Sequence, residues 1–180
     1  MATAPWLFLI DLQPAFSSAD SPWFTPGTDA LYARLRPLVA AFGPRVLFSR
    51  FVPPEGPPEG SWAPYYAEWP FALTAPASTW ALDDDWAGGR SIAADTFGKW
   101  TPEARAILDG AGEIVIGGVA TECCVMNTVL AALDDARQVC LLTDGCAGST
   151  ADAHDAAVAL MAMRAPQIRL STIDEALAST

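Results

Sequence analysis

The chain has 180 residues, enough for one domain with a substantial core, and 52% of them are apolar or aromatic. No apolar run approaches membrane-spanning length, and a formal net charge of −11 disfavours nucleic acids, whose phosphates it would repel. The chain opens on a short apolar run that ends at Asp11, which is typical of a core strand and not of a signal peptide. We therefore expect a cytoplasmic protein with no membrane or nucleic-acid partner.

Short apolar runs predict buried strands, and the segments between them have helical patterns. In chain order, the expected strands cover 5–11, 45–51, 112–118, 137–145 and 167–173. The expected helices cover 28–42, 101–110, 121–136 and 150–164, with cap-like residues at Thr101 and at Ser149–Thr150, and a short helix follows the last strand. The alternation predicts one domain over 1–180, a three-layer α/β/α fold with a mostly parallel, Rossmann-like sheet of roughly six strands.

Residues 53–90 interrupt this alternation with a stretch rich in Pro and Gly and then in aromatic residues. Such an insertion is typical of a lid or pocket wall, although an aromatic cluster can also simply cover a sheet edge. We expect pocket-wall residues here, within the chain or across a subunit interface: Trp62, Tyr65, Tyr66 and Trp69.

Asp11 follows the first expected strand directly, so it should lie at that strand's carboxyl end, where parallel sheets bind ligands. A site role and a structural one, as a loop cap or the partner of an arginine, are about equally expected for such a residue.

Cys123 and Cys124 stand side by side where a strand gives way to a helix, with Thr121 as the expected N-cap. A helix start lowers the pKa of a thiol and offers N–H groups to an oxyanion, so either cysteine is a candidate nucleophile. Buried cysteines are also common and inert, and the helical phase does not choose between these two.

Lys99, the only lysine, lies between Phe97 and Trp100. It is either a solvated surface residue or a cation that holds a thiolate and an aspartate together. A metal site is disfavoured, because His154 is the only histidine and the four cysteines lack CxxC spacing. No nucleotide-binding glycine motif is present, so we expect no cofactor.

Three stretches together resemble the isochorismatase-like cysteine hydrolases, which include nicotinamidases and N-carbamoylsarcosine amidase. FLIDLQPAF resembles the family's strand ending in D-x-Q-x-x-F, and GGVATECCVMNTVLAA resembles G-V-x-T-x-x-C-V-x-x-T-x-x-x-A. VCLLTDGCAGSTADAH resembles the strand and loop that follow.

The resemblance implies roles for particular residues. Asp11 matches the catalytic aspartate and Cys124 the nucleophile, whereas Cys123 falls on a variable position. The N–H groups of Ala120 and Cys124 would form the oxyanion hole, and the peptide bond between Val119 and Ala120 would be cis. Phe16, the aromatic residue of the first motif, is a candidate substrate contact.

The chain departs from the family pattern at two places. The motif K-x-x-[YF]-S-x-F puts Ala94 where lysine is expected, so either Lys99 replaces that lysine or the triad is incomplete. The first alternative is favoured, because the only lysine is kept here. Nicotinamidases bind a metal after the second strand, but SRFVPPEG at 49–56 has no histidine. In that stretch Arg50 is a candidate for binding a substrate carboxylate, or for a salt bridge to a nearby acid.

These observations predict a metal- and cofactor-independent cysteine hydrolase that cleaves a small amide or related C–N bond through a thioester. We expect a small-molecule substrate and a homo-oligomer, a dimer or a tetramer. Two alternatives stay open. One is an isochorismatase-type vinyl-ether hydrolase, which needs no cysteine, and the other is a non-catalytic binding module, for which the displaced lysine is the best argument.

Overall fold

A computed structural model describes residues 4–179 and contains a six-stranded sheet in which every pair of neighbouring strands is parallel. The strand order is β3-β2-β1-β4-β5-β6. The bounds are Trp6–Ile10 for β1, Val46–Phe51 for β2, Ser91–Ala94 for β3, Ile114–Val119 for β4, Val139–Ala147 for β5 and Ile168–Ser171 for β6. The predicted parallel α/β/α architecture is confirmed.

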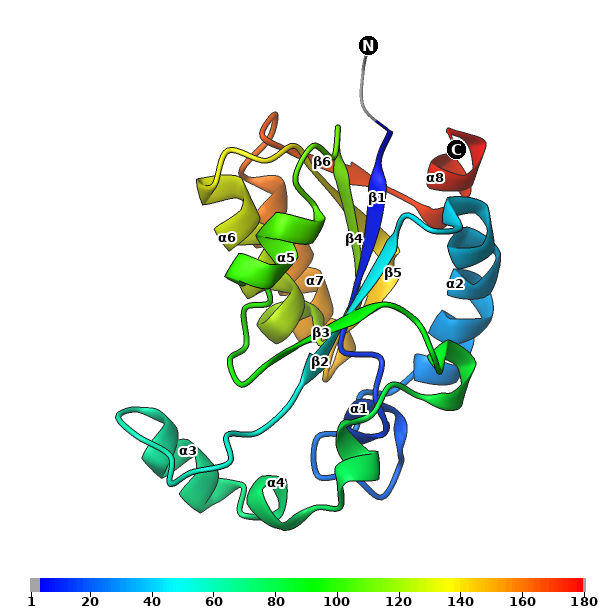
Figure 1. The fold of residues 1–180 in the computed structure, drawn as a ribbon. Helices are drawn as coiled ribbons and strands as arrows, with labels where there is room; N and C mark the ends of the chain where they lie inside the picture. The colour runs from blue at the N-terminus through cyan, green and yellow to red at the C-terminus, as the bar shows by residue number, and fades with distance from the viewer. Residues whose placement is uncertain (1–3, 180) are drawn as a thin grey trace.

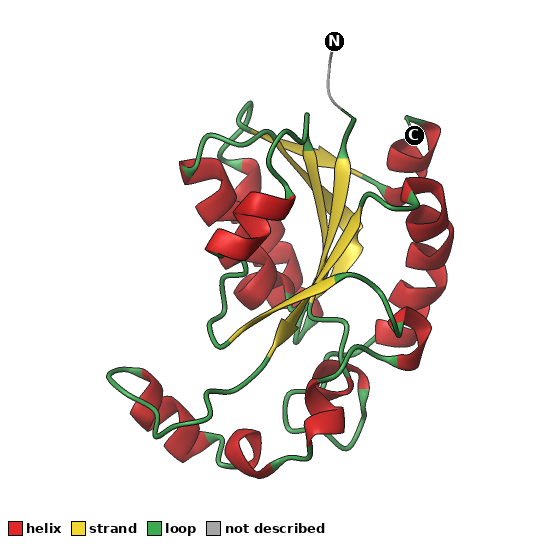
Figure 2. Ribbon diagram, viewed as in Figure 1, coloured by secondary structure: helices red, strands yellow, loops and turns green. Residues whose placement is uncertain are grey.

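Helices cover both faces of the sheet and bury its side chains in two clusters (Figures 1 and 2). Successive strand residues point to opposite faces, so Leu7 and Leu9 pack with one cluster and Phe8 and Ile10 with the other. One face carries α5 (Pro102–Ile107), α6 (Met126–Asp134) and α7 (Ala151–Ala162), and the other carries α2 (Thr28–Phe42) and α8 (Ile173–Ala178). Among residues 4–179 no helix is both long and apolar enough to cross a membrane.

Two elements differ from the sequence prediction. The edge strand β3 was not predicted, because its four residues, SIAA, carry only one large apolar side chain. The segment expected as one helix over 121–136 instead starts with a π-helix, η3 (Thr121–Val125), and continues as α6. Thr121 is not the N-cap of η3, a position that Ala120 occupies, and its hydroxyl is hydrogen-bonded to Nδ1 of His154 at 2.8 Å.

The aromatic segment 53–90 forms short helices, most of which lie beyond the carboxyl end of β2 (Figure 1). They are α3 (Trp62–Glu68), α4 (Phe71–Thr74) and the 3₁₀ turns η1 (Ala77–Trp80) and η2 (Asp84–Trp86). The last one, at 84–86, leads into β3 and packs Trp86 against Tyr32 of α2 and Phe48 of β2. Gln13, buried just before the short helix α1 (Pro14–Ser17), holds this segment to the sheet. Its Nε2 donates to the carbonyls of Phe51 and Trp80 at 3.0 and 2.8 Å, and its Oε1 accepts from Phe51 N–H at 2.7 Å.

The strand order reverses between β1 and β4, and such a switch point leaves a crevice where ligands bind in parallel sheets. Gly118 on β4 pairs with Ile10 on β1 and has a φ of 120°. A Cβ at Gly118 would lie 2.2 Å from the Ile10 carbonyl oxygen, so only glycine lets the two strands approach this closely. Asp11 follows β1 and Ala120 follows β4, so both lie at this crevice.

Candidate active site

Asp11 and Lys99 form a fully buried ion pair at the carboxyl end of β1. Lys99 Nζ lies 3.2 Å from Asp11 Oδ2, and both side chains are 0% exposed. Asp11 has a φ of 54°, a left-handed conformation that aspartate tolerates better than most residues, so the chain turns directly after the strand. Lys99 comes from the loop between β3 and α5, and because its side chain is fully buried it is not a surface lysine.

Neighbouring groups hold each charge of this pair in place. Ser49 on β2 donates its hydroxyl to Asp11 Oδ1 at 2.6 Å and accepts the Asp11 N–H at 3.2 Å. The Lys99 ammonium also donates to the Thr96 carbonyl and lies 4.6 Å from the centre of the Phe51 ring. Asp11 Oδ2 accepts no hydrogen bond, so it faces the ammonium with its acceptor capacity unfilled.

Thr128 on α6 links the lysine loop to the cysteine turn. Its buried hydroxyl accepts the Lys99 backbone N–H at 2.9 Å and donates to the Cys124 carbonyl at 2.6 Å. One side chain thereby fixes the distance between the segments that carry the cation and the thiol. Asp11 and Lys99 both interact electrostatically with the Cys124 thiol, so the structure brings the three residues implied by the resemblance together.

A hydrogen bond joins the two adjacent thiols, and it lowers the pKa of Cys123 while it raises that of Cys124. That bond, burial and the nearby Asp11 carboxylate raise the pKa of Cys124 well above the ordinary thiol value, against an opposite influence of Lys99. At Cys124 the neighbouring thiol, burial and a like charge thus act against the lowering of the pKa that is expected at a helix start. A base must take the proton before this thiol can act as a nucleophile.

The turn that carries Cys124 closes its hydrogen bonds on the Ala120 carbonyl. The Ala120 carbonyl accepts from the N–H groups of Cys123 and Val125, at 3.1 and 3.2 Å, and the Cys124 N–H between them is not among its donors. Such wide turns leave N–H groups free to bind an anion. The Val119–Ala120 peptide bond is cis.

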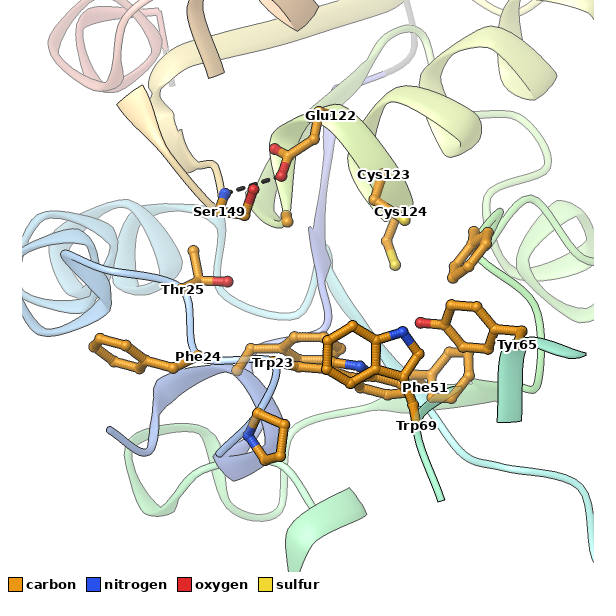
Figure 3. Close-up of a pocket in the computed structure, with 14 residues that line it drawn as sticks. Trp23, Phe24, Thr25, Phe51, Tyr65, Trp69, Glu122, Cys123, Cys124 and Ser149 are labelled. Carbon is orange, nitrogen blue, oxygen red and sulfur yellow. Dashed lines mark hydrogen bonds between the residues drawn. The ribbon is translucent and has the colours of Figure 1, made fainter. Parts of the chain in front are cut away.

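A cavity of about 250 Å³ opens beside Cys124, whose sulfur points into it (Figure 3). In Figure 3 the Tyr65 hydroxyl also points into the cavity, and burial together with Cys123 and Cys124 raises its pKa. The lining is largely aromatic: Phe16, Pro22, Trp23, Phe24, Thr25, Phe51, Tyr65, Trp69, Phe97, Ala120, Glu122, Cys123, Cys124 and Ser149.

Three candidate substrate contacts do not line this cavity. Arg50 follows Ser49 on β2, and successive strand residues point to opposite faces of the sheet. Since Ser49 reaches Asp11, Arg50 points away from it. There Arg50 lines a separate groove, with its Nη1 3.5 Å from the Trp80 carbonyl oxygen. Trp62 stands behind the wall, with its ring 5.3 Å from Tyr65 and 4.8 Å from Phe97. Tyr66 is buried behind Trp62, at a ring distance of 5.8 Å.

Several residues of the site were not among the candidates drawn from the sequence. Trp23 lies at the centre of the aromatic wall but comes from the irregular stretch between α1 and α2, where no periodicity predicts burial. Ser49 and Thr128 are small polar residues inside apolar runs, which was the signal available for both. Glu122 was treated as part of a helix start, and only the folded turn places it beside the cavity.

Several solved structures share the fold of this chain. Among solved structures, an isochorismatase-like hydrolase from Alkaliphilus metalliredigens is 16% identical, with a TM-score of 0.79 and 99% of each chain covered. A cysteine hydrolase from Pseudomonas syringae pv. phaseolicola 1448A is 15% identical, with a TM-score of 0.85 over 97% of this chain and 91% of that one. A pyrazinamidase of Pyrococcus horikoshii, solved in complex with zinc, is 20% identical, with a TM-score of 0.70 over 93% and 98%.

At these identities the solved structures establish a shared fold. No curated protein matches the chain significantly. The family is established by the sequence itself, because a family model for the isochorismatase domain matches residues 5–173, nearly the whole chain. The chain belongs to the isochorismatase family.

Proposed function

We propose that this protein is a cysteine hydrolase that cleaves a small amide or a related C–N bond through a thioester. The observation that carries the proposal is the buried Asp11–Lys99 pair, which acts electrostatically on a thiol that faces a cavity. Asp11 is the general base, Cys124 the nucleophile, and Lys99 the cation that stabilises the charges formed between them.

The reaction begins with transfer of the Cys124 thiol proton to Asp11, whose Oδ2 has unfilled acceptor capacity. The thiolate then attacks the carbonyl carbon, and the N–H groups of Ala120 and Cys124 bind the oxyanion. Asp11 returns the proton to the nitrogen as the C–N bond breaks, and ammonia or an amine leaves. Water then attacks the thioester and gives a proton to Asp11. The C–S bond breaks, the carboxylic acid leaves, and Asp11 returns the proton to the Cys124 sulfur.

The raised pKa of Cys124 supports this assignment of roles. A thiol that stays protonated at neutral pH needs a base in contact with it, and Asp11 is the carboxylate that acts on it. The cost of forming two charges in a dry site is offset by the ammonium of Lys99, which already lies 3.2 Å from the base.

The residues of this chain do not fit the zinc site of a metal-dependent relative. The stretch after β2 has no histidine, and His154 is hydrogen-bonded to Thr121 through Nδ1. Among residues 4–179, no three His, Cys, Asp or Glu side chains are grouped to hold a metal ion. We therefore assign no step to a metal.

The alternatives differ in what they require of the thiol. The best argument for a non-catalytic module was the displaced lysine, and that argument is weakened because Lys99 reaches Asp11 beside a cavity. A vinyl-ether hydrolase of the isochorismatase type would keep its activity after the thiol is blocked, whereas a cysteine hydrolase would lose it.

The test is a hydrolysis screen over a panel of small amides with matched cysteine variants. Cys124→Ala should lower kcat/KM at least about 1,000-fold at an unchanged melting temperature, because the nucleophile is gone. Cys123→Ser should retain turnover, since the neighbouring sulfur is not the attacking atom. Full activity in the Cys124→Ala variant on any substrate found would contradict the proposal.

A further inference from the structure

The wall of the cavity is built from aromatic rings that hold one another in place. Trp23 packs edge-on against Phe51 at 5.5 Å, and it lies 5.8 Å from Tyr65 and 6.3 Å from Trp69. Phe97 packs against Tyr65 at 5.4 Å. Aromatic faces carry partial negative charge, so a cage of this kind attracts a cation and packs well against a flat apolar group.

Glu122 is the one charged residue among those that line the cavity. Its Oε1 accepts the Ser149 N–H at 2.9 Å, a bond visible at the far end of the cavity from Tyr65 and Trp69 (Figure 3). Its Oε2 is buried and accepts no hydrogen bond, and no ion pair within residues 4–179 includes Glu122. A carboxylate therefore lies beside the cavity without a cation to neutralise it.

The other charges near the cavity do not offset Glu122. Lys99 is fully buried and paired with Asp11, so together they add no net charge. Arg50, the candidate for binding a substrate carboxylate, lines a different groove on the opposite face of the sheet. The lining thus carries one negative charge that no cation offsets, and a substrate carboxylate would find no cationic side chain there.

From this arrangement we propose that the site takes small amides whose remaining group is a positively charged nitrogen, such as an ammonium on a flat apolar body, and that Glu122 selects them against carboxylates. The cavity volume of about 250 Å³ corresponds to about eight water molecules at liquid density, which limits the substrate to a small molecule. The identity of the scissile amide rests on the proposed function, whereas the preference for charge does not.

The charge preference is tested by ligand binding to the Cys124→Ala variant, which lacks the proposed nucleophile. Benzylamine, benzyl alcohol and benzoate have similar size and differ in charge, and their binding to the Cys124→Ala variant is followed by the fluorescence of the wall tryptophans. Benzylamine should bind at least about 10-fold more tightly than benzyl alcohol, and benzoate at least about 10-fold more weakly, because the ligand's charge lies near the Glu122 carboxylate and among aromatic rings.

Glu122→Gln, made in the Cys124→Ala background, isolates the charge, because its amide oxygen can still accept the Ser149 N–H. The ratio of benzylamine to benzoate affinity should fall at least about 10-fold, with benzyl alcohol changed less than about threefold. Glu103→Gln on the exposed side of α5 is the matched control and should leave the ratio unchanged. If Glu122 only holds the Ser149 turn, Glu122→Gln will change the three affinities equally, and this overturns the proposal.

A parallel hydrolysis series separates this proposal from the proposed function. Wild-type kcat/KM is compared for 4-(aminomethyl)benzamide, benzamide and 4-carbamoylbenzoate, and the expected order follows that of the binding series. If the amine ligand binds best but no amide is cleaved, the charge selection stands and the proposed function fails. If amides are cleaved without preference for charge, or benzylamine does not bind at about 10 mM, the charge selection fails.

Discussion

Replacing Lys99 by methionine leaves Asp11 as a buried carboxylate without a counter-ion. We expect the free energy of unfolding to fall by about 3–5 kcal/mol, the usual cost of removing one partner of a buried ion pair. The geometry supports this size, since unit charges 3.2 Å apart attract by about 5 kcal/mol at an effective dielectric constant of about 20. In a chain of 180 residues the loss corresponds to a decrease in Tm of about 6–20 °C.

Urea denaturation followed by circular dichroism measures this loss, and two controls show its origin. Arg36→Met removes a cation from an exposed pair with Asp85 and should cost less than about 1 kcal/mol. The double variant Asp11→Asn/Lys99→Met should be more stable than Lys99→Met alone, because it leaves no unpaired charge. Lys99→Met within about 1 kcal/mol of the wild type would refute the reading of this pair as buried and charged. The variant should also lose amide hydrolysis, which Arg36→Met should keep.

Two further predictions concern the thiol and the link behind it. In a Cys123→Ala variant, burial and Asp11 still raise the pKa of Cys124, so its thiolate fraction at neutral pH is lower than that of free cysteine. Iodoacetamide labelling of Cys124, read by mass spectrometry, should therefore be slow near pH 7. The labelling rate should keep rising above about pH 9. Labelling that is already maximal at neutral pH would contradict the direction of that shift. Thr128→Val leaves the Lys99 N–H and the Cys124 carbonyl without their partner, so it should lower the free energy of unfolding by about 2–4 kcal/mol and remove most of the turnover. Thr128→Ser keeps the hydroxyl and should keep both stability and turnover. Equal effects of valine and serine would exclude the hydrogen bonds as the cause.

The strands that carry the site could be predicted because each has a strong local signal. The runs at β1, β2, β4 and β5 are buried on both faces, so they are apolar almost throughout, and Asp11 directly follows the first of them. The edge strand β3 has no such signal, since it pairs on one side only and contains mostly small residues. Its absence from the prediction matters, because the loop that follows β3 delivers Lys99.

The walls of the cavity could not be predicted from spacing, because the wall residues share no element. Trp23, Phe51 and Phe97 come from three separate loops or strand ends, and their contacts depend on how Gln13 holds the chain beyond β2. The face on which Arg50 lies was not predicted, for a related reason. A one-residue step along a strand reverses the face, so a candidate next to Ser49 in sequence lies on the far side of the sheet from Asp11.

Lys99 lies at a different sequence position from the lysine of the family motif. The family pattern places the lysine at the position of Ala94, which in this chain is the last residue of β3, yet the Lys99 ammonium reaches Asp11 from a loop five residues further on. Burying this ammonium is costly, and the cost is offset by the Asp11 carboxylate, the Thr96 carbonyl and the Phe51 ring. Lys99 is the only lysine of this acidic chain, and its burial against Asp11 is what the proposed role requires. The position of the charge, and not the position of the residue in the sequence, is what the chemistry requires.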